Sequence, residues 1–427
     1  MRLAMLSLAI CLAITASIAI AEPPAYRQVD ERRAGQLGLR QIVGRHLRLY
    51  TDLPASNAVD ELPLVFDAAV EQWAEYFDVP HRRVVRWKMQ GFLMQDRDKF
   101  AALKLLPESK ADFVSGYTQG LELWLKEQPS DYYRRHLLLH EGTHGFMYAH
   151  LGGVGPGWYS EGMAELLGTH RWKDAQLQLG VMPADRGEVP MWGRIKLIRD
   201  ASRAGQPLGL RAVLGLGQRE VLTTDQYAWC WGLCKFLDAD PRWQPKFRQL
   251  QQHVADPKFN QHFQEAFHET SSESEVDQEW NAFVATLDYG YDAERMAMVH
   301  TAASAGEQAG AIEIAADRGW QATGWQLRAG QEYKVTATGR FQIAYDSQPW
   351  PCEPGGVTLE YHEGRPLGML LGAISSADGS TFAEPLAIGL ERTLKPEHDG
   401  QLYLRVNDSP AQLSDNRGAL QVSHSPQ

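Results

Sequence analysis

Residues 140–144 read His-Glu-Gly-Thr-His, a spacing that works as a metal site only on an α-helix. A helix has 3.6 residues per turn, so His140 and His144 project from the same face and can share one cation. Glu141 stands beside the first histidine, where its carboxylate can act as a general base toward water. The spacing predicts a helix with two zinc ligands and a base, which is typical of a hydrolase.

The residues around the motif predict a long, mostly buried helix. Ser130 or Asp131 can cap its first amides, and Gly152 follows its last residues. Gly142 and Gly145 each cost about 1 kcal/mol relative to alanine inside a helix, so we expect them to let another element approach closely. The alternative is a core helix that carries two histidines without binding metal.

A catalytic zinc ion needs a third protein ligand and one open position. Residues 158–167 predict a second helix that packs back against the first. Glu161 and Glu165 lie one turn apart on one face of it. One carboxylate can therefore bind the metal while the other holds the second ring nitrogen of a ligand histidine.

His-Glu-x-x-His followed by Trp-x-Ser-Glu-Gly-x-Ala-Glu resembles the gluzincin zinc peptidases, most closely the peptidase-MA-like group of secreted bacterial proteins. The resemblance extends over roughly residues 40–290 and implies a zincin-like α+β catalytic domain. It also implies residue roles: zinc ligands His140, His144 and Glu161, general base Glu141, and Glu165 orienting a ligand histidine. A solvated helix residue is the alternative for Glu165.

Two further residues are candidates for the site. Gluzincins often use a tyrosine or histidine downstream of the third ligand to donate to the oxyanion, and Tyr227 lies 66 residues after Glu161. A buried core tyrosine is the alternative. His136 lies one turn before His140 and is expected either to support the site or to lie on the surface.

Hydrophobic patterning predicts the rest of the catalytic module. Alternation predicts strands over residues 46–53, 113–117 and 121–125, and apolar spacing predicts helices over residues 59–77, 227–237, 243–253 and 259–283. The strand before the motif helix is expected to edge the cleft, where an extended substrate backbone can pair with it. Cys230 and Cys234, one turn apart, are expected to be buried thiols.

The pattern changes after about residue 287 to short alternating strands separated by glycines, as in an all-β sandwich. The loop over residues 406–418 resembles that of small calcium-dependent galactophilic lectins of bacteria. That resemblance implies a set of residues for calcium or sugar: Asp408, Asp415, Asn416, the Gln412 carbonyl and Tyr345. The alternative is a tight loop kept for folding, with no sugar bound.

The N-terminal residues 1–21 read as a signal peptide, and no other apolar run is long enough to cross a bilayer. We therefore expect an exported protein, periplasmic or extracellular. The net charge of −11 makes the chain a poor nucleic-acid binder.

These observations predict an α+β zincin-like catalytic domain (residues 22–300) followed by an all-β, lectin-like sandwich (residues 301–427). The expected function is a secreted zinc peptidase that acts on peptides or proteins, with Ca²⁺ and glycans as expected ligands of the C-terminal domain. The alternative is an inactive peptidase-like scaffold that binds glycans.

Overall fold

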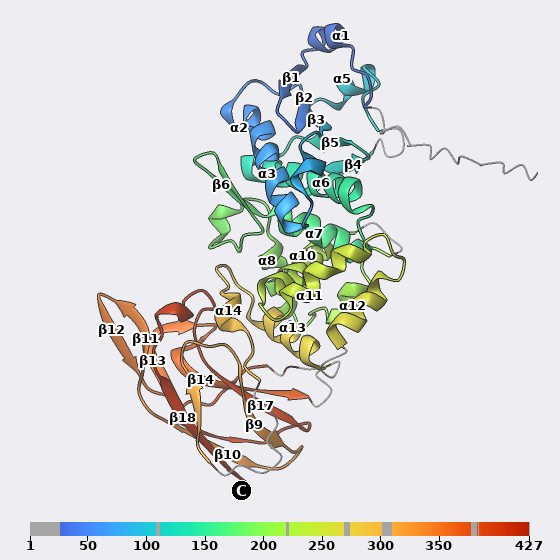
Figure 1. The fold of residues 1–427 in the computed structure, drawn as a ribbon. Helices are drawn as coiled ribbons and strands as arrows, with labels where there is room; N and C mark the ends of the chain where they lie inside the picture. The colour runs from blue at the N-terminus through green and yellow to red at the C-terminus, as the bar shows by residue number, and fades with distance from the viewer. Residues whose placement is uncertain are drawn as a thin grey trace, which may run out of the picture.

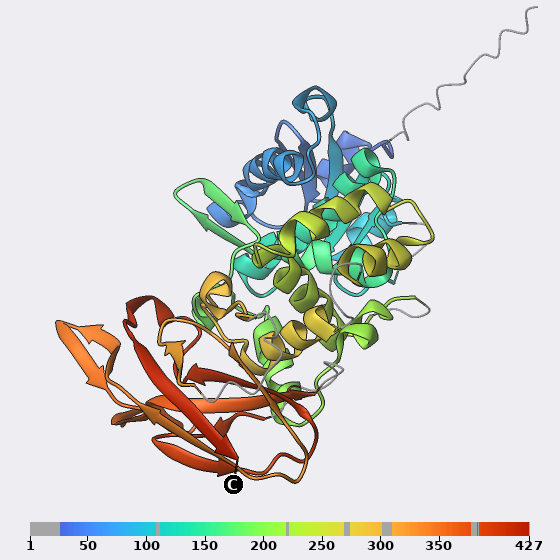
Figure 2. The ribbon, with the colours of Figure 1, turned by 60° about the horizontal axis from the view of Figure 1, so that its bottom comes forward.

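The structure is a computed structural model that describes residues 26–107, 112–218, 222–268, 274–300, 310–376, 382 and 384–426. The expected signal peptide lies outside these residues. The chain is a mixed α/β protein with several β-sheets. Figures 1 and 2 show the first sheet (blue) and the C-terminal strands (orange to red) at opposite ends of the molecule, with helices (green to yellow) between them.

The N-terminal sheet has the strand order β1-β2-β3-β5-β4. Its strands are β1 (Arg40–Val43), β2 (Leu47–Thr51), β3 (Met89–Met94), β4 (Gly116–Gln119) and β5 (Glu122–Lys126). The neighbours β2, β3 and β5 are parallel, whereas β4 pairs antiparallel with β5 and forms one edge. The strand predicted over residues 113–117 begins only at Gly116, because Phe113 instead packs into a small aromatic core beside the sheet.

The motif lies in the helix α6 (Asp131–Leu151), which packs against α3 (Leu62–Tyr76). Of the two predicted capping residues, Ser130 caps α6 by accepting from the amide of Tyr133, and Gly152 ends the helix in the left-handed conformation. The close approach predicted for Gly142 is confirmed. A Cβ atom there would lie 2.6 Å from the indole of Trp73 on α3.

Two more helices complete the support of α6. The helix α7 (Gly157–Gly168) packs between α6 and α10 (Thr224–Ala239). A Cβ atom on Gly162 would lie 2.4 Å from Sγ of Cys234, so the glycine lets α7 and α10 touch. Cys230 and Cys234 are free and buried, as predicted.

The described chain before residue 300 forms ten further α-helices. They are α1 (Glu31–Gln36), α2 (Asn57–Asp60), α4 (His81–Val84), α5 (Arg97–Ala102), α8 (Arg194–Arg203), α9 (Leu210–Leu214), α11 (Gln244–Gln249), α12 (Phe259–His268), α13 (Ser274–Thr286) and α14 (Ala293–Met296). A hairpin of β6 (His170–Lys173) and β7 (Gln176–Leu179) follows α7. Within the described residues, no helix has the length and apolar character needed to span a membrane.

The described chain from residue 312 onward contains strands and one short 3-10 turn. One sheet has the order β16-β10-β18-β8, a second has β13-β14-β17-β9 with β15 beside β14, and β11 pairs with β12. The strands are β8 (Ile312–Ala315), β9 (Gln321–Leu327), β10 (Tyr333–Thr338), β11 (Phe341–Asp346), β12 (Gln348–Cys352), β13 (Gly355–His362), β14 (Arg365–Ser376), β15 (Leu386–Ala387), β16 (Glu391–Leu394), β17 (Gly400–Val406) and β18 (Ala419–Pro426).

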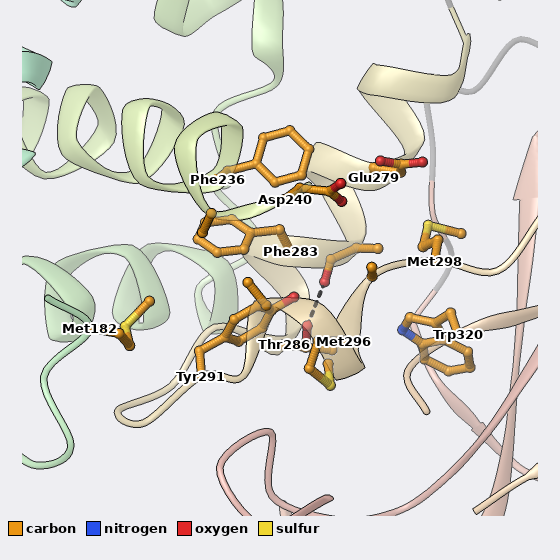
Figure 3. A pocket seen from close by; sticks show the side chains of 14 residues that line it. Met182, Phe236, Asp240, Glu279, Phe283, Thr286, Tyr291, Met296, Met298 and Trp320 are labelled. Carbon is orange, nitrogen blue, oxygen red and sulfur yellow. Dashed lines mark hydrogen bonds between the residues drawn. The ribbon is translucent and has the colours of Figure 1, made fainter. Parts of the chain in front are cut away.

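The C-terminal strands pack against the helices of the N-terminal module. Ala282 and Met298 share a buried cluster with Trp320 and Tyr403 of the β part. A narrow cavity, with room for about one water molecule, remains between α13, α14 and the chain that enters β9. Figure 3 shows Met296, Met298 and Trp320 around it.

Candidate metal centre

Three side chains from α6 and α7 converge at one point. His140 and His144 lie one turn apart on α6, and Glu161 faces them from α7. The Nε2 atoms of the two histidines are 3.3 Å apart, and Glu161 Oε2 lies 3.3 Å from each of them. The three atoms therefore form an almost equilateral triangle and a group that can hold a metal ion.

The size of this triangle fits a four-coordinate metal. Zinc binds imidazole nitrogen and carboxylate oxygen at about 2.0–2.2 Å, and two corners of a regular tetrahedron of that size lie about 3.3–3.6 Å apart. The observed separations of 3.3 Å match this edge. A site with three such ligands leaves the fourth corner for water or substrate.

One oxygen of the triangle lacks a regular hydrogen-bond partner. Glu161 Oε2 is buried and makes no regular hydrogen bond within the described residues. Burial alone would raise the pKa of this carboxyl, but His144 and His140 outweigh burial and hold it well below its usual value. A buried carboxylate oxygen facing two imidazole nitrogens has the chemistry of a cation site.

Glu165 contacts the ring nitrogen of His140 that points away from the triangle. Its Oε1 lies 3.4 Å from Nδ1 of His140, which is the position expected of a residue that orients a ligand histidine. Arg194 of α8 donates from Nη2 to Oε1 at 2.9 Å and from Nε to Oε2 at 3.0 Å. Burial would raise the pKa of Glu165, but Arg194 and the adjacent histidines keep it well below normal.

His144 has a different partner at its other ring nitrogen. Ser160 Oγ lies 3.3 Å from Nδ1 of His144, so the residue before Glu161 contacts the remaining ring nitrogen. Neither Ser160 nor Arg194 was predicted from the sequence. Ser160 lies directly before Glu161 in the Trp-x-Ser-Glu motif, so helical spacing could have identified it. Arg194 is 29 residues from Glu165 in the sequence, and no local pattern indicates their contact.

The general base predicted at Glu141 is buried between α6 and the edge strand β4. Thr118 of β4 donates from Oγ1 to Glu141 Oε2 at 2.7 Å. A Cβ atom on Gly116 would lie 2.4 Å from Oε1, so glycine makes room for the carboxylate. Burial raises the pKa of Glu141 despite the opposing effect of His140 and His144. Thr118 and Gly116 were also not predicted as site residues, since the strand contact is long range.

Tyr227 lies at the same site. It is in the first turn of α10, and its ring centroid is 6.0 Å from that of His140. The guanidinium of Arg194 lies 6.0 Å from the same tyrosine ring. Burial raises the pKa of Tyr227, and the carboxylates of Glu161 and Glu165 raise it further, so the hydroxyl keeps its proton and remains a hydrogen-bond donor.

His136 belongs to the support of the site and is not a surface residue. It is buried, and its Nε2 lies 3.3 Å from Glu165 Oε2. Burial lowers the pKa of His136, so the ring is neutral near pH 7.

The loop predicted to bind calcium is brought together in the β part. Asp408 Oδ2 accepts from Asn416 Nδ2 at 2.8 Å, and Tyr345 donates its amide to Asp415 Oδ2 at 3.2 Å. Asp415 Oδ1 and Asn416 Oδ1 are buried without a hydrogen-bond partner in the described chain. Gln412 is exposed at the start of the 3-10 turn Leu413–Asp415.

Asp408 is buried in this loop, beside the guanidinium of Arg405, which donates to the Asp408 carbonyl oxygen at 2.8 Å. Burial raises the pKa of Asp408 to about 6, although hydrogen bonds from Asn416 and Ser409 oppose the shift. The carboxylate oxygen Asp415 Oδ1 and the amide oxygen Asn416 Oδ1 are hard donors of the kind that calcium prefers, whereas both oxygens of Asp408 already accept hydrogen bonds. Asp415 and Asn416 are therefore the candidate calcium ligands of this loop.

Comparisons with known proteins do not assign this chain to a family. No protein-family model matches the sequence, and the curated proteins contain no match. Among solved structures, part of the chain is similar to one described as "EclA N-terminal domain; PllA-like lectin", with 20% sequence identity and a TM-score of 0.22. The similarity covers 28% of this chain and 96% of that chain. Because the TM-score is this low, the similarity indicates neither the fold nor a ligand of this chain.

Proposed function

We propose that the protein is a zinc-dependent peptidase whose metal is held by His140, His144 and Glu161. The observation that carries the proposal is the triangle of their three ligand atoms, each 3.3 Å from the others, next to a buried glutamate that is not a ligand. Two nitrogens and one carboxylate oxygen with an open fourth position are the donor set of catalytic zinc.

The residues around the triangle supply the remaining chemistry. When bound, zinc polarises a carbonyl and activates water. Glu141 accepts a proton from the attacking water and returns it to the leaving amine. Thr118 holds one oxygen of Glu141 and leaves the other for this transfer. Tyr227, whose ring centroid is 6.0 Å from that of His140, would donate a hydrogen bond to the carbonyl oxygen as negative charge develops there.

The position of β4 favours a peptide as the substrate. This strand lies at the edge of its sheet and contacts the general base through Thr118. An extended peptide can add to such an edge by backbone hydrogen bonds, which would bring its scissile bond beside Glu141.

Metal analysis and peptide cleavage test the proposal together. The purified full chain is expected to contain about one zinc per molecule and to cleave members of a random peptide library, with loss of cleavage on adding a chelator. His144→Ala is expected to lose the metal, and Glu141→Gln to keep the metal and lose turnover. Glu75→Gln, on the exposed face of α3, is the control. Unchanged cleavage in Glu141→Gln, or unchanged metal content in His144→Ala, contradicts the proposal.

We also propose that the loop over residues 408–416 binds calcium and that glycans are the ligand class of the β part. The unpartnered oxygens of Asp415 and Asn416, close to Asp408, support calcium. The glycan proposal rests on the resemblance of this loop to that of the bacterial lectins. Isothermal titration of the full chain with calcium, and then with a galactoside panel, tests both parts.

A further inference from the structure

Each carboxylate oxygen of Glu165 lies close to one arginine nitrogen and one histidine nitrogen. Oε1 lies 2.9 Å from Nη2 of Arg194 and 3.4 Å from Nδ1 of His140. Oε2 lies 3.0 Å from Nε of Arg194 and 3.3 Å from Nε2 of His136. One carboxylate therefore joins a ligand histidine, a second histidine and an arginine in a place that water does not reach.

His136, His140 and Glu165 form a second group of side chains of the metal-binding types. A second metal ion there is unfavourable, because the guanidinium of Arg194 already occupies both oxygens of the carboxylate. A dication at the same oxygens would stand beside a buried positive charge, and that repulsion is strong in a low dielectric. The guanidinium of Arg194 thus supplies the positive charge that balances Glu165.

Arg194 is well placed to fix other groups. It is the first residue of α8 and only 4% exposed, so its side chain has little freedom. A fork of two parallel hydrogen bonds fixes the plane and rotation of a carboxylate, which a single bond from an ammonium does not do. The guanidinium also lies against the ring of Tyr227, which in turn contacts the ring of His140.

We propose that Arg194 is the positioning residue of the metal centre: it holds Glu165 in the orientation that aligns His140 and, through its contact with the ring, sets the position of Tyr227. The proposal rests on the proposed zinc site but assigns a role that lies outside the ligand set. Its consequence is that metal affinity depends on the fork that Arg194 makes and not only on its charge.

Substitution of Arg194 separates these contributions. Arg194→Met removes charge and fork, whereas Arg194→Lys keeps the charge and loses the fork. Loss of an outer partner of a ligand histidine typically changes metal affinity or activity about 10- to 100-fold. We expect zinc affinity, measured by competition with a chromogenic chelator, to fall in the order wild type, Arg194→Lys, Arg194→Met. The visible spectrum of the cobalt-substituted protein should change in the same order.

Arg134 is the matched control. It is also buried and also makes a fork, from Nε and Nη2 to the two oxygens of Glu127, and it lies six residues before His140 on α6. Arg134→Lys should lower the melting temperature to a degree similar to Arg194→Lys and leave zinc affinity and the cobalt spectrum unchanged. At saturating zinc, Arg194→Lys should still show a lower kcat with little change in KM, because Tyr227 is displaced.

The outcomes are distinct. Unchanged zinc affinity and an unchanged cobalt spectrum in Arg194→Lys overturn the role of Arg194, and so does an equal loss of affinity in Arg134→Lys. If Arg194→Met does not fold, Arg194→Lys alone decides. A chain that binds zinc but cleaves no peptide overturns the proposed peptidase activity, while the affinity measurements still decide the role of Arg194. A chain that binds no zinc overturns both.

Discussion

Thr118 Oγ1 donates to Glu141 Oε2 at 2.7 Å, and this bond joins the edge strand β4 to the motif helix α6. The same hydroxyl lies 2.9 Å from the carbonyl oxygen of Glu141. Thr118 thus links the carboxylate of Glu141, the proposed general base, to the strand that we expect to pair with substrate.

Thr118→Val removes this donor while keeping a β-branched side chain of similar size. We expect kcat/KM for peptide cleavage to fall about 10-fold or more, because Glu141 loses the bond that orients it. Zinc content should not change, since Thr118 bonds to the base and the base is not a proposed ligand. Thr118→Ser keeps the hydroxyl and is expected to retain most activity. Equal activity in the valine and serine variants would show that the bond has no role in catalysis.

Alanine in place of glycine should lower the free energy of unfolding at Gly142 and raise it at Gly35. A Cβ atom on Gly142 would meet rigid aromatic side chains, 2.6 Å from Trp73 and 2.7 Å from Phe66. Overpacking costs about 1–3 kcal/mol, which exceeds the roughly 1 kcal/mol that alanine contributes to a helix. A Cβ atom on Gly35 in α1 would meet no other atom within 4 Å, so Gly35→Ala should raise the free energy of unfolding. Urea unfolding measures both, and stabilisation by Gly142→Ala would contradict the packing argument.

The neutral ring of His170 should make the protein sensitive to acid. Burial lowers the pKa of His170 from 6.5 to about 3. Nδ1 donates to the carbonyl of Gly168 at 2.8 Å, and Nε2 accepts from Nε of Arg135 at 3.3 Å. Both ring nitrogens thus have partners that suit the neutral form. A proton on Nε2 would displace the guanidinium.

Because the folded pKa lies below the unfolded one, the unfolded chain binds the proton first as the pH falls. This contribution to stability is intact above about pH 6.5 and is lost between pH 6.5 and about 3, by about 1.4 kcal/mol per pH unit. His170→Gln cannot take up this proton, so its free energy of unfolding should fall less steeply between pH 6.5 and 4. His81→Gln, at an exposed position, should follow the wild type. An unchanged acid slope in His170→Gln would contradict this account.

Calcium should raise the melting temperature of the full chain, because an ion bound only by the folded state stabilises that state by mass action. The increase in stability is about 2.7 kcal/mol when free calcium is 100 times the Kd. Asp415→Ala removes one of the unpartnered oxygens and should abolish the shift. Magnesium serves as a control, since it requires a tighter octahedral shell. A shift that persists in Asp415→Ala would place the ion elsewhere.

Local sequence patterns predicted several elements correctly. The capping serine at Ser130 and the terminating glycine at Gly152 define a helix through rules that act over a few residues. The helix period then places His140 and His144 together. Strand boundaries were less accurate, as at Gly116, because the packing of Phe113 decides where β4 begins.

The sequence by itself determined which residue types occur at helical spacing, and therefore the two histidines and their neighbouring base. Only the tertiary structure decided that Glu161 Oε2 lies 3.3 Å from both ring nitrogens, since this depends on how α7 packs on α6. It also decided that Arg194, Thr118 and Ser160 are the partners of Glu165, Glu141 and His144. The physical reason is the sequence separation over which each interaction acts. Periodicity and capping act within a few residues, whereas the hydrogen-bond donors of a buried carboxylate come from distant segments that the hydrophobic core packs beside it.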